Sequence, residues 1–229
     1  MPQPVKDIAE TVSAFIKSGQ ALMVGGFGRG GVPFTVLDYI ADRPGQYKDF
    51  TLYKNDANEP DLGIGRLLKN GQVKKLCTTH IGLNPAFIAQ MNAGEVVCEL
   101  MPQGIFAEKI RAGGAGIPAF LSDIGLGTIY ADGKQKMMLD GKEYILERAF
   151  TGDVALICAD KVDTEGNCWW AGSNRNMCVV MATACKYAIV EAREIVPAGE
   201  IAPESVHLPG LFVSSVVRAG KRRRQQEAA

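Results

Sequence analysis

The chain has 229 residues, 47% of them hydrophobic, which is enough to form one sizeable core. Lysine plus arginine and aspartate plus glutamate each number 25, so no overall field favours nucleic acid or an anionic membrane surface. The longest apolar run, 177–185, is far shorter than the roughly 20 residues of a membrane-spanning helix, and the polar residues 3–10 are unlike a signal peptide.

The six cysteines indicate reduced thiols. No two of them have the C-x-x-C spacing, and most lie in apolar runs, which predicts buried thiols in a cytoplasmic protein. Cys77 and His80 lie close together in sequence, but two ligands do not complete a tetrahedral site, so we expect no metal. His207 has no partner that the sequence reveals, and we expect it in a loop.

Strands and helices alternate through the first half of the chain. Apolar residues recur with helical spacing between Val5 and Ile16, and Gly19 ends this helix. Strands are predicted at 21–24, 50–54, 73–79 and 96–101, and a turn and an apolar-periodic stretch follow each of them. Asn84 and Pro85 are typical of the start of a helix after the third strand, and a further helix is predicted from about Phe106.

This alternation predicts a parallel sheet with helices on its faces. Because the connections between parallel strands share one hand, the turns that follow the four strands are expected along one edge. Open sheets of this kind bind ligands at the carboxyl ends of their strands. We therefore expect one crevice to be bordered by "GGFGRGG", "NDANEP", "HIGLNP" and "MPQG", although glycine, asparagine and proline are common in any turn.

The second half of the sequence is less regular. The glycine-rich stretch 111–128 predicts a loop, because glycine disfavours a helix interior. Strands are predicted at 154–159, 168–171, 187–190 and 211–217, and a buried helix at 176–186. Since no Ser/Pro-rich linker divides the chain, we expect one domain over 1–217 and a polar tail over 218–229. The predicted fold is an open, mostly parallel, Rossmann-like α/β sheet with helices on both faces and an irregular second half.

The first turn raises the question of a dinucleotide site. Gly26, Gly28 and Gly31 satisfy G-x-G-x-x-G, the fingerprint of NAD-binding domains. Such domains bind the ribose hydroxyls through an acidic residue at the end of the second strand. Here Asp56 follows a lysine and an asparagine, which suit an anion or a carbonyl group better. A nucleotide-binding domain therefore stays only a minor alternative.

The segment "MVGGFGRGGVP" resembles the signature of the family I CoA-transferases, whose alpha subunits carry G-G-F-x-x-x-G-x-P after the first strand. Further segments match in the same order: "ND" at 55–56, "IGLNP" at 81–85, "MPQGIFAEKIRAGGAGIPAF" at 101–120, "DGKEYILERAFTGDVALICADKVDTEGN" at 140–167, "SNRNM" at 173–177 and "KYAIVEAREIVPAGEIAPESVHLPG" at 186–210. The resemblance is to the alpha subunits of 3-oxoacid, butyrate–acetoacetate or 3-oxoadipate CoA-transferases. It extends from the first helix to about Val217, and the 101–120 segment is its most specific part.

The resemblance implies an enzyme that moves CoA between carboxylic acids through a glutamyl-CoA intermediate. In this family the attacking glutamate lies in a Ser-Glu-Asn-Gly motif of the beta subunit, and that motif is absent from this chain. We therefore expect the chain to act with a beta subunit, in an α2β2 assembly, on an acyl-CoA and a carboxylic acid. CoA is a substrate, and the resemblance implies no resident cofactor and no nucleic-acid or membrane partner.

The resemblance also gives the candidate site residues. Gln103 corresponds to the family glutamine beside the nucleophile, whose N–H helps to form the oxyanion hole, and a donor of this kind contributes roughly 3 kcal/mol in acyl-transfer sites. A plain turn glutamine after Pro102 is the alternative. The glycine-rich turn is expected to bring bare backbone, with amides free for anionic oxygen, close to the substrate or the partner subunit. The residues expected to contact CoA or the acyl group are Gly25, Gly26, Phe27, Gly28, Arg29, Gly30, Gly31, Asn55 and Asp56.

Some of these roles have alternatives. An Asx turn explains Asn55 and Asp56 about as well as a place in the acyl pocket does. Arg29 stands where the family often has an uncharged residue, and it suits a phosphate, an acyl carboxylate or a plain surface position. Met177 replaces a phenylalanine of related chains and Trp169–Trp170 is unusual, and core packing is the default interpretation of both.

The acyl groups are not fixed by the sequence. We favour short monocarboxylates, because a dicarboxylate would need an additional cation and only Arg29 and Lys54 are expected nearby. A 3-oxoadipate or succinyl-CoA type dicarboxylate transferase is the main alternative. A sugar-phosphate isomerase-like domain has no supporting motif in this sequence.

Overall fold

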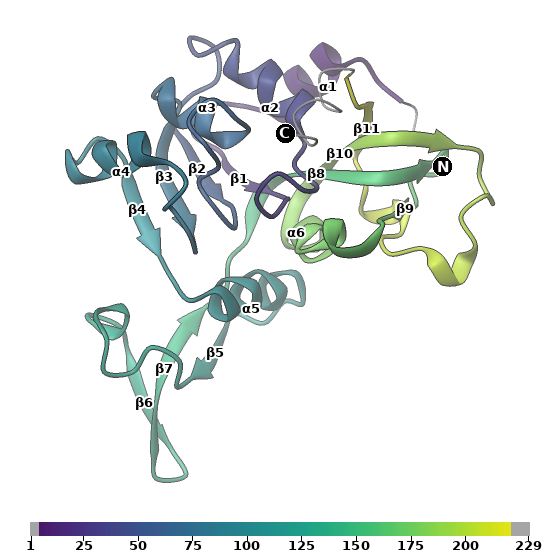
Figure 1. Cartoon of the computed structure of the whole chain (residues 1–229). Helices are drawn as coiled ribbons and strands as arrows, with labels where there is room; N and C mark the ends of the chain where they lie inside the picture. The colour runs from purple at the N-terminus through teal and green to yellow at the C-terminus, as the bar shows by residue number, and fades with distance from the viewer. Residues whose placement is uncertain (1–4, 221–229) are drawn as a thin grey trace.

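Eight strands form the main sheet of the computed structural model, which describes residues 5–220 (Figure 1). In sheet order they are β11 (Ser215–Arg218), β10 (Cys185–Val196), β8 (Gly152–Asp163), β1 (Ala21–Val24), β2 (Phe50–Tyr53), β3 (Val73–Thr78) and β4 (Val97–Leu100), and β9 (Cys168–Trp169) pairs with β8. All of these pairings are parallel except that between β9 and β8. The mostly parallel sheet predicted from the sequence is confirmed.

Helices cover both faces of this sheet, as predicted. In the described residues the α-helices are α1 (Ile8–Phe15), α2 (Phe34–Ala41), α3 (Ile64–Lys69), α4 (Pro85–Asn92), α5 (Gln103–Gly114) and α6 (Cys178–Ala184). Side chains of α1 to α4 belong to one buried cluster, and those of α5 and α6 belong to a second. None of the helices within residues 5–220 has both the length and the apolar character needed to span a membrane.

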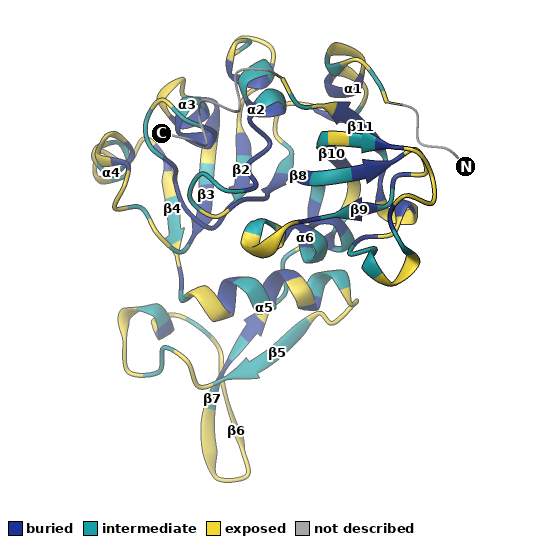
Figure 2. Cartoon of the chain, turned by 45° about the vertical axis from the view of Figure 1, so that its right-hand side comes forward, coloured by how far each residue is buried: buried dark blue, intermediate teal, exposed yellow. Residues whose placement is uncertain are grey.

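Alternation along the strands explains why the sheet has a core on each face. Leu22 belongs to the cluster beneath α1 to α4, and its neighbour Met23 belongs to the cluster beneath α5 and α6. The strand register sets Leu22 beside Leu52 of β2 and Val154 of β8, so that apolar rows cross the sheet. These strands lie in the buried centre of the molecule (Figure 2). A strand covered on both faces needs apolar residues at every position, which is why these strands appear in the sequence as continuous apolar runs.

The turns after β1, β2, β3 and β4 lie along one edge of the sheet, because these four strands are neighbours and run parallel. The predicted start of α4 is also correct. Pro85 is its first residue, and the Asn84 side chain accepts a hydrogen bond from the Phe87 N–H at 2.9 Å. The edge that the sequence predicted for a ligand is therefore present.

The prediction of a loop over 111–128 is wrong in two parts. Helix α5 starts at Gln103, earlier than predicted, and continues through Gly114, and residues 119–122 form a strand. The two glycines at the end of α5 allow close packing. A Cβ on Gly113 would lie 1.9 Å from the Phe150 carbonyl oxygen, and one on Gly114 would lie 2.4 Å from the Thr183 hydroxyl. Tertiary contact therefore overrides the low helix propensity of glycine here.

A second, antiparallel sheet was missed by the sequence analysis. It contains β5 (Ala119–Ser122), β7 (Lys142–Arg148) and β6 (Lys136–Leu139), in that order. We call residues 119–148 the small lobe, which projects from the main body below α5 (Figure 1). Asp140 and Gly141 join β6 to β7 and have positive φ angles of 48° and 76°. An Asp-Gly pair between two strands is a strong hairpin signal that the sequence contained.

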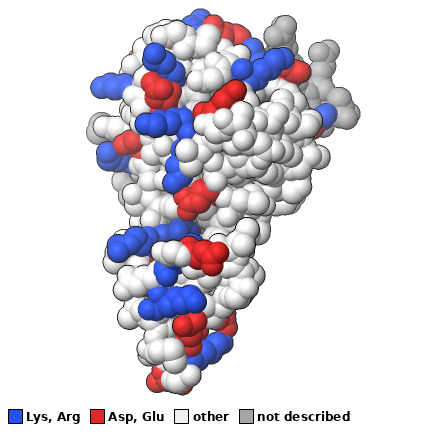
Figure 3. Space-filling view, turned by 90° about the vertical axis from the view of Figure 1, so that its left-hand side faces the viewer, with Lys and Arg blue, Asp and Glu red and all other residues white. Residues whose placement is uncertain are grey.

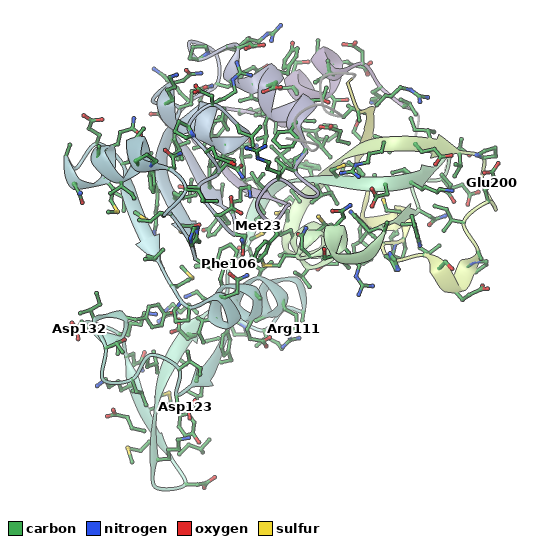
Figure 4. All side chains as sticks on the ribbon, in the orientation of Figure 1. Met23, Phe106, Arg111, Asp123, Asp132 and Glu200 are labelled. Atoms are coloured by element: carbon green, nitrogen blue, oxygen red, sulfur yellow. The ribbon has the colours of Figure 1, made fainter. Side chains whose placement is uncertain are left out.

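Helix α5 lies between the main sheet and the small lobe (Figure 1). Its Phe106 points towards the main sheet, in the direction of Met23 (Figure 4), and both side chains belong to the same buried cluster. The helix begins two residues after Met101, whose N–H bonds to the Thr78 carbonyl at 3.0 Å. Packing of α5 thus sets Gln103 at the edge that carries the four turns.

The second half of the main sheet is more regular than expected. The strands predicted at 154–159 and 187–190 are β8 and β10, and each of them has 12 residues. The last strand, β11, ends at Arg218. Residues 221–229 of the predicted polar tail lie outside the described residues, so the domain boundary at 217 stays a prediction.

A buried carboxylate of β10 fixes the start of α2. The N-cap residue Pro33 offers no side-chain hydrogen bond. Instead the Glu191 carboxylate accepts from the N–H and the hydroxyl of Thr35, at 2.8 and 2.9 Å, and from the N–H of Val36 at 3.3 Å. Glu191 has no exposed surface, so these bonds form away from water.

We expect Glu191→Ala to lower the free energy of unfolding by about 2–3 kcal/mol, because buried N–H groups of α2 lose a charged acceptor. Urea denaturation of the purified chain measures this change. Glu194→Ala is the matched control on the same strand, since Glu194 is 57% exposed and lies 3.7 Å from Lys161, and it should cost less than about 0.5 kcal/mol. Equal, small losses in both variants would contradict this role of Glu191.

Candidate functional site

The Asp56 carboxylate lies at the centre of the turn after β2. One of its oxygens accepts from the Lys54 ammonium at 3.1 Å, the Gly28 N–H at 2.9 Å and the Asn55 amide at 3.2 Å. The other accepts from the Asn58 N–H at 3.0 Å and the Asn58 amide at 2.8 Å. Five donors thus surround a side chain that is 3% exposed as a residue. The carboxylate links the end of β2 to the glycine-rich turn.

Electrostatics keep this buried pair charged. Burial raises the pKa of the Asp56 carboxyl, but the Lys54 charge and the hydrogen bonds from Gly28 and Asn55 outweigh this effect, so its pKa lies below the usual value. Burial lowers the pKa of the Lys54 ammonium, and Asp56 counteracts part of that change. A buried ion pair with its remaining hydrogen bonds satisfied is strongly disrupted when one partner is removed.

This geometry gives Asp56 a positioning role instead of the expected contact with substrate. Its oxygens are filled by protein donors and its surface is almost closed to solvent. The same observation argues against the dinucleotide alternative, since the carboxylate that would bind ribose hydroxyls is already used. An Asx turn, the other interpretation of the sequence, is present in the bond from the Asn58 N–H to the Asp56 side chain.

The glycine-rich turn is a closed loop whose amides are largely occupied. Phe27 and Gly30 exchange two backbone hydrogen bonds, at 3.0 and 3.1 Å. The Gly25 N–H bonds to the Leu156 carbonyl at 2.9 Å, the Gly26 N–H to the Asn176 side chain at 3.3 Å, and the Gly28 N–H to Asp56. The expectation that these amides are free for anionic oxygen is therefore wrong for Gly25, Gly26, Phe27, Gly28 and Gly30. Instead, the internal bonds hold the loop in one shape.

Glycine is required where this loop touches the rest of the chain. Gly26 has a φ of 104°, and a Cβ there would lie 2.4 Å from the Val32 side chain. Gly31 has a φ of 72°, and a Cβ there would lie 2.7 Å from the Asn174 carbonyl oxygen. The pattern that resembles a dinucleotide fingerprint thus arises from backbone shape and close approach.

Gln103 is held by two polar side chains from neighbouring turns. Its amide nitrogen donates to the Asn55 side-chain oxygen at 2.6 Å, and its amide oxygen accepts from the Thr79 hydroxyl at 2.5 Å. Thr79 also bonds the Asn55 carbonyl at 2.7 Å. The structure thus brings together Gln103 and Asn55, as predicted, and adds Thr79, which the sequence analysis did not single out. We call these three residues the amide cluster.

The amide cluster leaves donors available at the edge of the sheet. Asn55 is buried and Thr79 half-buried, whereas Gln103 is exposed, with one N–H of its side-chain amide beyond the bond to Asn55. Gln103 is also the first residue of α5, and Pro102 before it provides no side-chain cap. The first N–H groups of a helix have no partner within the helix and carry partial positive charge. This arrangement can hold oxygen that gains negative charge.

The two cations expected near the acyl group are both paired. Lys54 bonds to Asp56, and the Arg29 guanidinium lies 2.9 Å from the Glu59 carboxylate. Arg29 and Glu59 are partly exposed, so their pair is a loop contact of small energetic weight. The surface role considered for Arg29 fits this geometry.

A second turn lines a cavity beside the glycine-rich loop. Residues 172–176 meet Phe27 and Gly30 around a cavity of about 520 Å³. The Arg175 side chain is exposed there and has no hydrogen bond or ion pair with any described residue. The sequence analysis quoted "SNRNM" but assigned Arg175 no role, because nothing in the sequence shows that this turn approaches the first one. Bonds from Gly26 to Asn176 make that approach.

The other candidate nucleophiles are already engaged. Glu99 lies 2.7 Å from Lys75, Glu108 bonds to Arg111, Glu147 lies between Lys109 and Lys134, and Glu191 caps α2. Burial, with help from the charge of Glu99, raises the pKa of the Cys77 thiol to about 12, so it remains a thiol near neutral pH. No group of three or more metal-ligating side chains occurs within the described part of the chain.

His207 and the two tryptophans pack together away from this edge. The His207 ring accepts a hydrogen bond from the Trp170 N–H at 3.1 Å and stacks with Trp169 and Trp170. His207 lies in a loop, as predicted. Trp170 is 2% exposed and its indole N–H bonds to the Cys158 carbonyl, which confirms core packing for this residue.

Comparisons with known proteins agree with this geometry. A family model described as coenzyme A transferase matches residues 5–219. The chain is 42% identical over 221 residues to a Helicobacter pylori (strain J99) relative, the first of the two subunits of succinyl-CoA:3-ketoacid coenzyme A transferase, and the match covers 96% of this chain and 94% of that relative. It is 39% identical over 209 residues to the acetoacetyl-CoA:acetate/butyrate CoA transferase alpha subunit of Clostridium acetobutylicum, with 91% and 95% covered.

The fold is also that of a solved enzyme. An acyl-CoA transferase of Escherichia coli O157:H7, in a thioester complex with CoA, superposes with a TM-score of 0.85 at 24% identity. The match covers 95% of this chain and 47% of that chain, so this chain spans about half of it. The sequence matches and the shared fold lead to one conclusion: the chain belongs to the coenzyme A transferase family and is one of its alpha subunits.

Proposed function

We propose that this chain forms one half of the active site of a two-chain CoA-transferase that exchanges CoA between an acyl-CoA and a short-chain carboxylic or 3-oxo acid. The observation that carries this proposal is the amide cluster, which holds the Gln103 amide in one orientation at the start of α5. CoA enters as a substrate, and the proposal needs no resident cofactor. We expect the reaction in the cytoplasm.

The proposed chemistry needs an attacking carboxylate from a partner subunit. A partner glutamate attacks the thioester carbonyl, the carbon–sulfur bond breaks, and a mixed anhydride and CoA thiolate form. The thiolate then attacks the glutamyl carbonyl of the anhydride, which releases the first acid and leaves a glutamyl-CoA thioester. The acceptor carboxylate attacks this thioester, and return of the thiolate to the new acyl group gives the second acyl-CoA and restores the glutamate.

This chain contributes to those steps by stabilising negative charge. Each attack places charge on a carbonyl oxygen, and fixed N–H donors there lower the barrier because they need no reorganisation. The side-chain N–H of Gln103 and the first N–H groups of α5 are the donors proposed for this oxygen. Asn55 and Thr79 hold the glutamine amide so that its N–H side faces the reaction.

The paired cations favour acids with a single carboxylate. Lys54 and Arg29 already have carboxylate partners, so neither offers free charge to the distal end of a dicarboxylate. Relatives are named both for succinyl-CoA:3-ketoacid and for acetoacetyl-CoA:acetate/butyrate transfer, so a dicarboxylate donor is the second candidate. Arg175 is the cation by which this chain would meet such a group, or would meet a phosphate of CoA.

The division of the active site has a direct test. The purified chain alone should show no transfer between acetoacetyl-CoA and butyrate, because its carboxylates near the site are engaged. Addition of its partner subunit should restore turnover, measured by loss of the acetoacetyl-CoA absorbance. Robust turnover by a partner-free preparation would contradict the proposal.

Loss of the glutamine amide should slow the reaction while the complex persists. In the two-chain enzyme, we expect Gln103→Ala to lower kcat/KM by about 100-fold, as the loss of one oxyanion donor does. Thr79→Val keeps the side-chain shape but frees the Gln103 amide, and we expect a fall of about tenfold, mainly in kcat. Gln46→Ala, at an exposed glutamine in another loop, should have no effect. Unchanged rates in Gln103→Ala would remove this residue from the reaction.

Substitution of Arg175 distinguishes the two uses of its charge. If it binds a phosphate of CoA, we expect Arg175→Ala to raise KM about tenfold for every acyl-CoA and to leave KM for the acids unchanged. If it binds a distal carboxylate, only succinyl-CoA and succinate should lose affinity, which would favour the dicarboxylate alternative. Arg148→Ala, at an exposed arginine of the small lobe, is the control. Steady-state kinetics with both substrate classes separate these outcomes.

A further inference from the structure

The outer edge of the small lobe is a β-strand without a neighbour. Strand β6 lies at the end of the sheet order β5-β7-β6, and no other described strand pairs with its outer side. All four of its residues are exposed, and the hairpin projects from the main body (Figure 2). Exposed edges of this kind pair readily with strands of other chains, and proteins usually protect them.

This edge is apolar where protection would be expected. Met137, Met138 and Leu139 are 43%, 65% and 50% exposed, and no proline or bulge interrupts them. Charged side chains of both signs lie side by side on the projecting lobe (Figure 3). The residues that flank the apolar ones are Lys136 and Asp140, which carry opposite charges. A strand with this pattern is suited to association with a complementary strand.

The hairpin geometry determines which backbone groups face outwards. In a hairpin with a two-residue turn, the residues that flank the turn form a hydrogen-bonded pair, and such pairs then occur at every second position. Here the turn is Asp140–Gly141, so Leu139 and Met137 bond to β7. The bond from the Leu146 N–H to the Gln135 carbonyl, at 2.9 Å, fits this alternation. The N–H and C=O groups of Lys136 and Met138 therefore face away from β7.

The outward groups fit a second copy of the same strand. If two copies of β6 run antiparallel with Met138 opposite Met138, these residues can exchange two backbone hydrogen bonds across a two-fold axis. The same register sets Lys136 opposite Asp140 twice and Met137 opposite Leu139 twice. Centring the pair on Lys136 would place like charges face to face, and centring it on Met137 would place Lys136 against Met138. One register is thus complementary in both charge and hydrophobicity.

We propose that β6 is a self-association surface that pairs with β6 of a second copy of this chain. The two small lobes then form one continuous sheet in the order β5-β7-β6-β6′-β7′-β5′. This interface would join two alpha–beta pairs into a four-chain enzyme. It does not depend on the reaction proposed above, because the small lobe carries none of the residues of the amide cluster.

Charge reversal tests this proposal on the complete two-chain enzyme. Light scattering after size-exclusion chromatography should give the mass of two copies of each subunit. Lys136→Glu and Asp140→Lys each create two repulsive pairs at the axis, and we expect each to raise the dissociation constant between alpha–beta pairs at least about tenfold. Lys74→Glu, an exposed charge reversal on β3, should leave the mass unchanged.

The mixture of the two variants gives the sharpest result. A Lys136→Glu chain opposite an Asp140→Lys chain has two attractive pairs, so the four-chain mass should return when the two are mixed. Met138→Cys provides an independent measurement: a short bis-maleimide should link two alpha chains, and it should not link two wild-type chains. Circular dichroism checks that each variant is folded.

Three results would overturn the proposal. The four-chain mass could be absent in the wild type, it could persist in both single variants, or the mixture could fail to restore it. If Lys136→Glu instead released the beta subunit, the edge would belong to the partner and not to a second alpha chain. Activity of each variant is measured in parallel, so that loss of assembly is distinguished from failure of the transferase proposal.

Discussion

The buried Asp56 carboxylate is the interaction on which the site depends. It accepts five hydrogen bonds, from Lys54, from its two asparagine neighbours and from the Gly28 backbone. Through these bonds it ties the turn after β2 to the glycine-rich loop after β1, and it compensates the charge of a lysine that has no exposed surface. Removal of such a partner leaves an unpaired buried charge, which costs about 3–5 kcal/mol. The loop shape and the position of Asn55 therefore follow from one ion pair.

The same bonds decide what this chain is able to do chemically. A carboxylate attacks a thioester only if an oxygen is free and accessible, and the nearby carboxylates here are used for structure. Asp56 is filled by donors, Glu59 bonds to Arg29, and Glu99 bonds to Lys75. What remains is a set of donors: Gln103, fixed by Asn55 and Thr79, at the uncapped start of α5. The site is suited to stabilising charge and depends on another polypeptide for the nucleophile.

The sequence predicted the half of this arrangement that rests on local patterns. Apolar strands followed by polar turns led correctly to the parallel sheet, to the common edge and to the start of α4 at Asn84. The family motif identified Gln103 and Asn55. Long-range packing could not be predicted: Gly113 and Gly114 looked like loop residues, yet they let α5 approach Phe150 and Thr183. The bonds that occupy the loop amides come from residues up to 150 positions away, such as Asn176, so the amides looked free. Thr79 carried no signal of its own, because a single threonine at the end of a strand is ordinary.

The measurement that tests this account most directly is the location of the covalent intermediate. The two-chain enzyme is incubated with acetoacetyl-CoA alone, the enzyme-bound thioester is reduced with borohydride or trapped with hydroxylamine, and the modified peptide is identified by mass spectrometry. The account predicts a modified glutamate on the partner polypeptide and none on this chain. A modified Asp56, Glu59 or Glu99 would contradict it, because each of these carboxylates is held here as a structural acceptor.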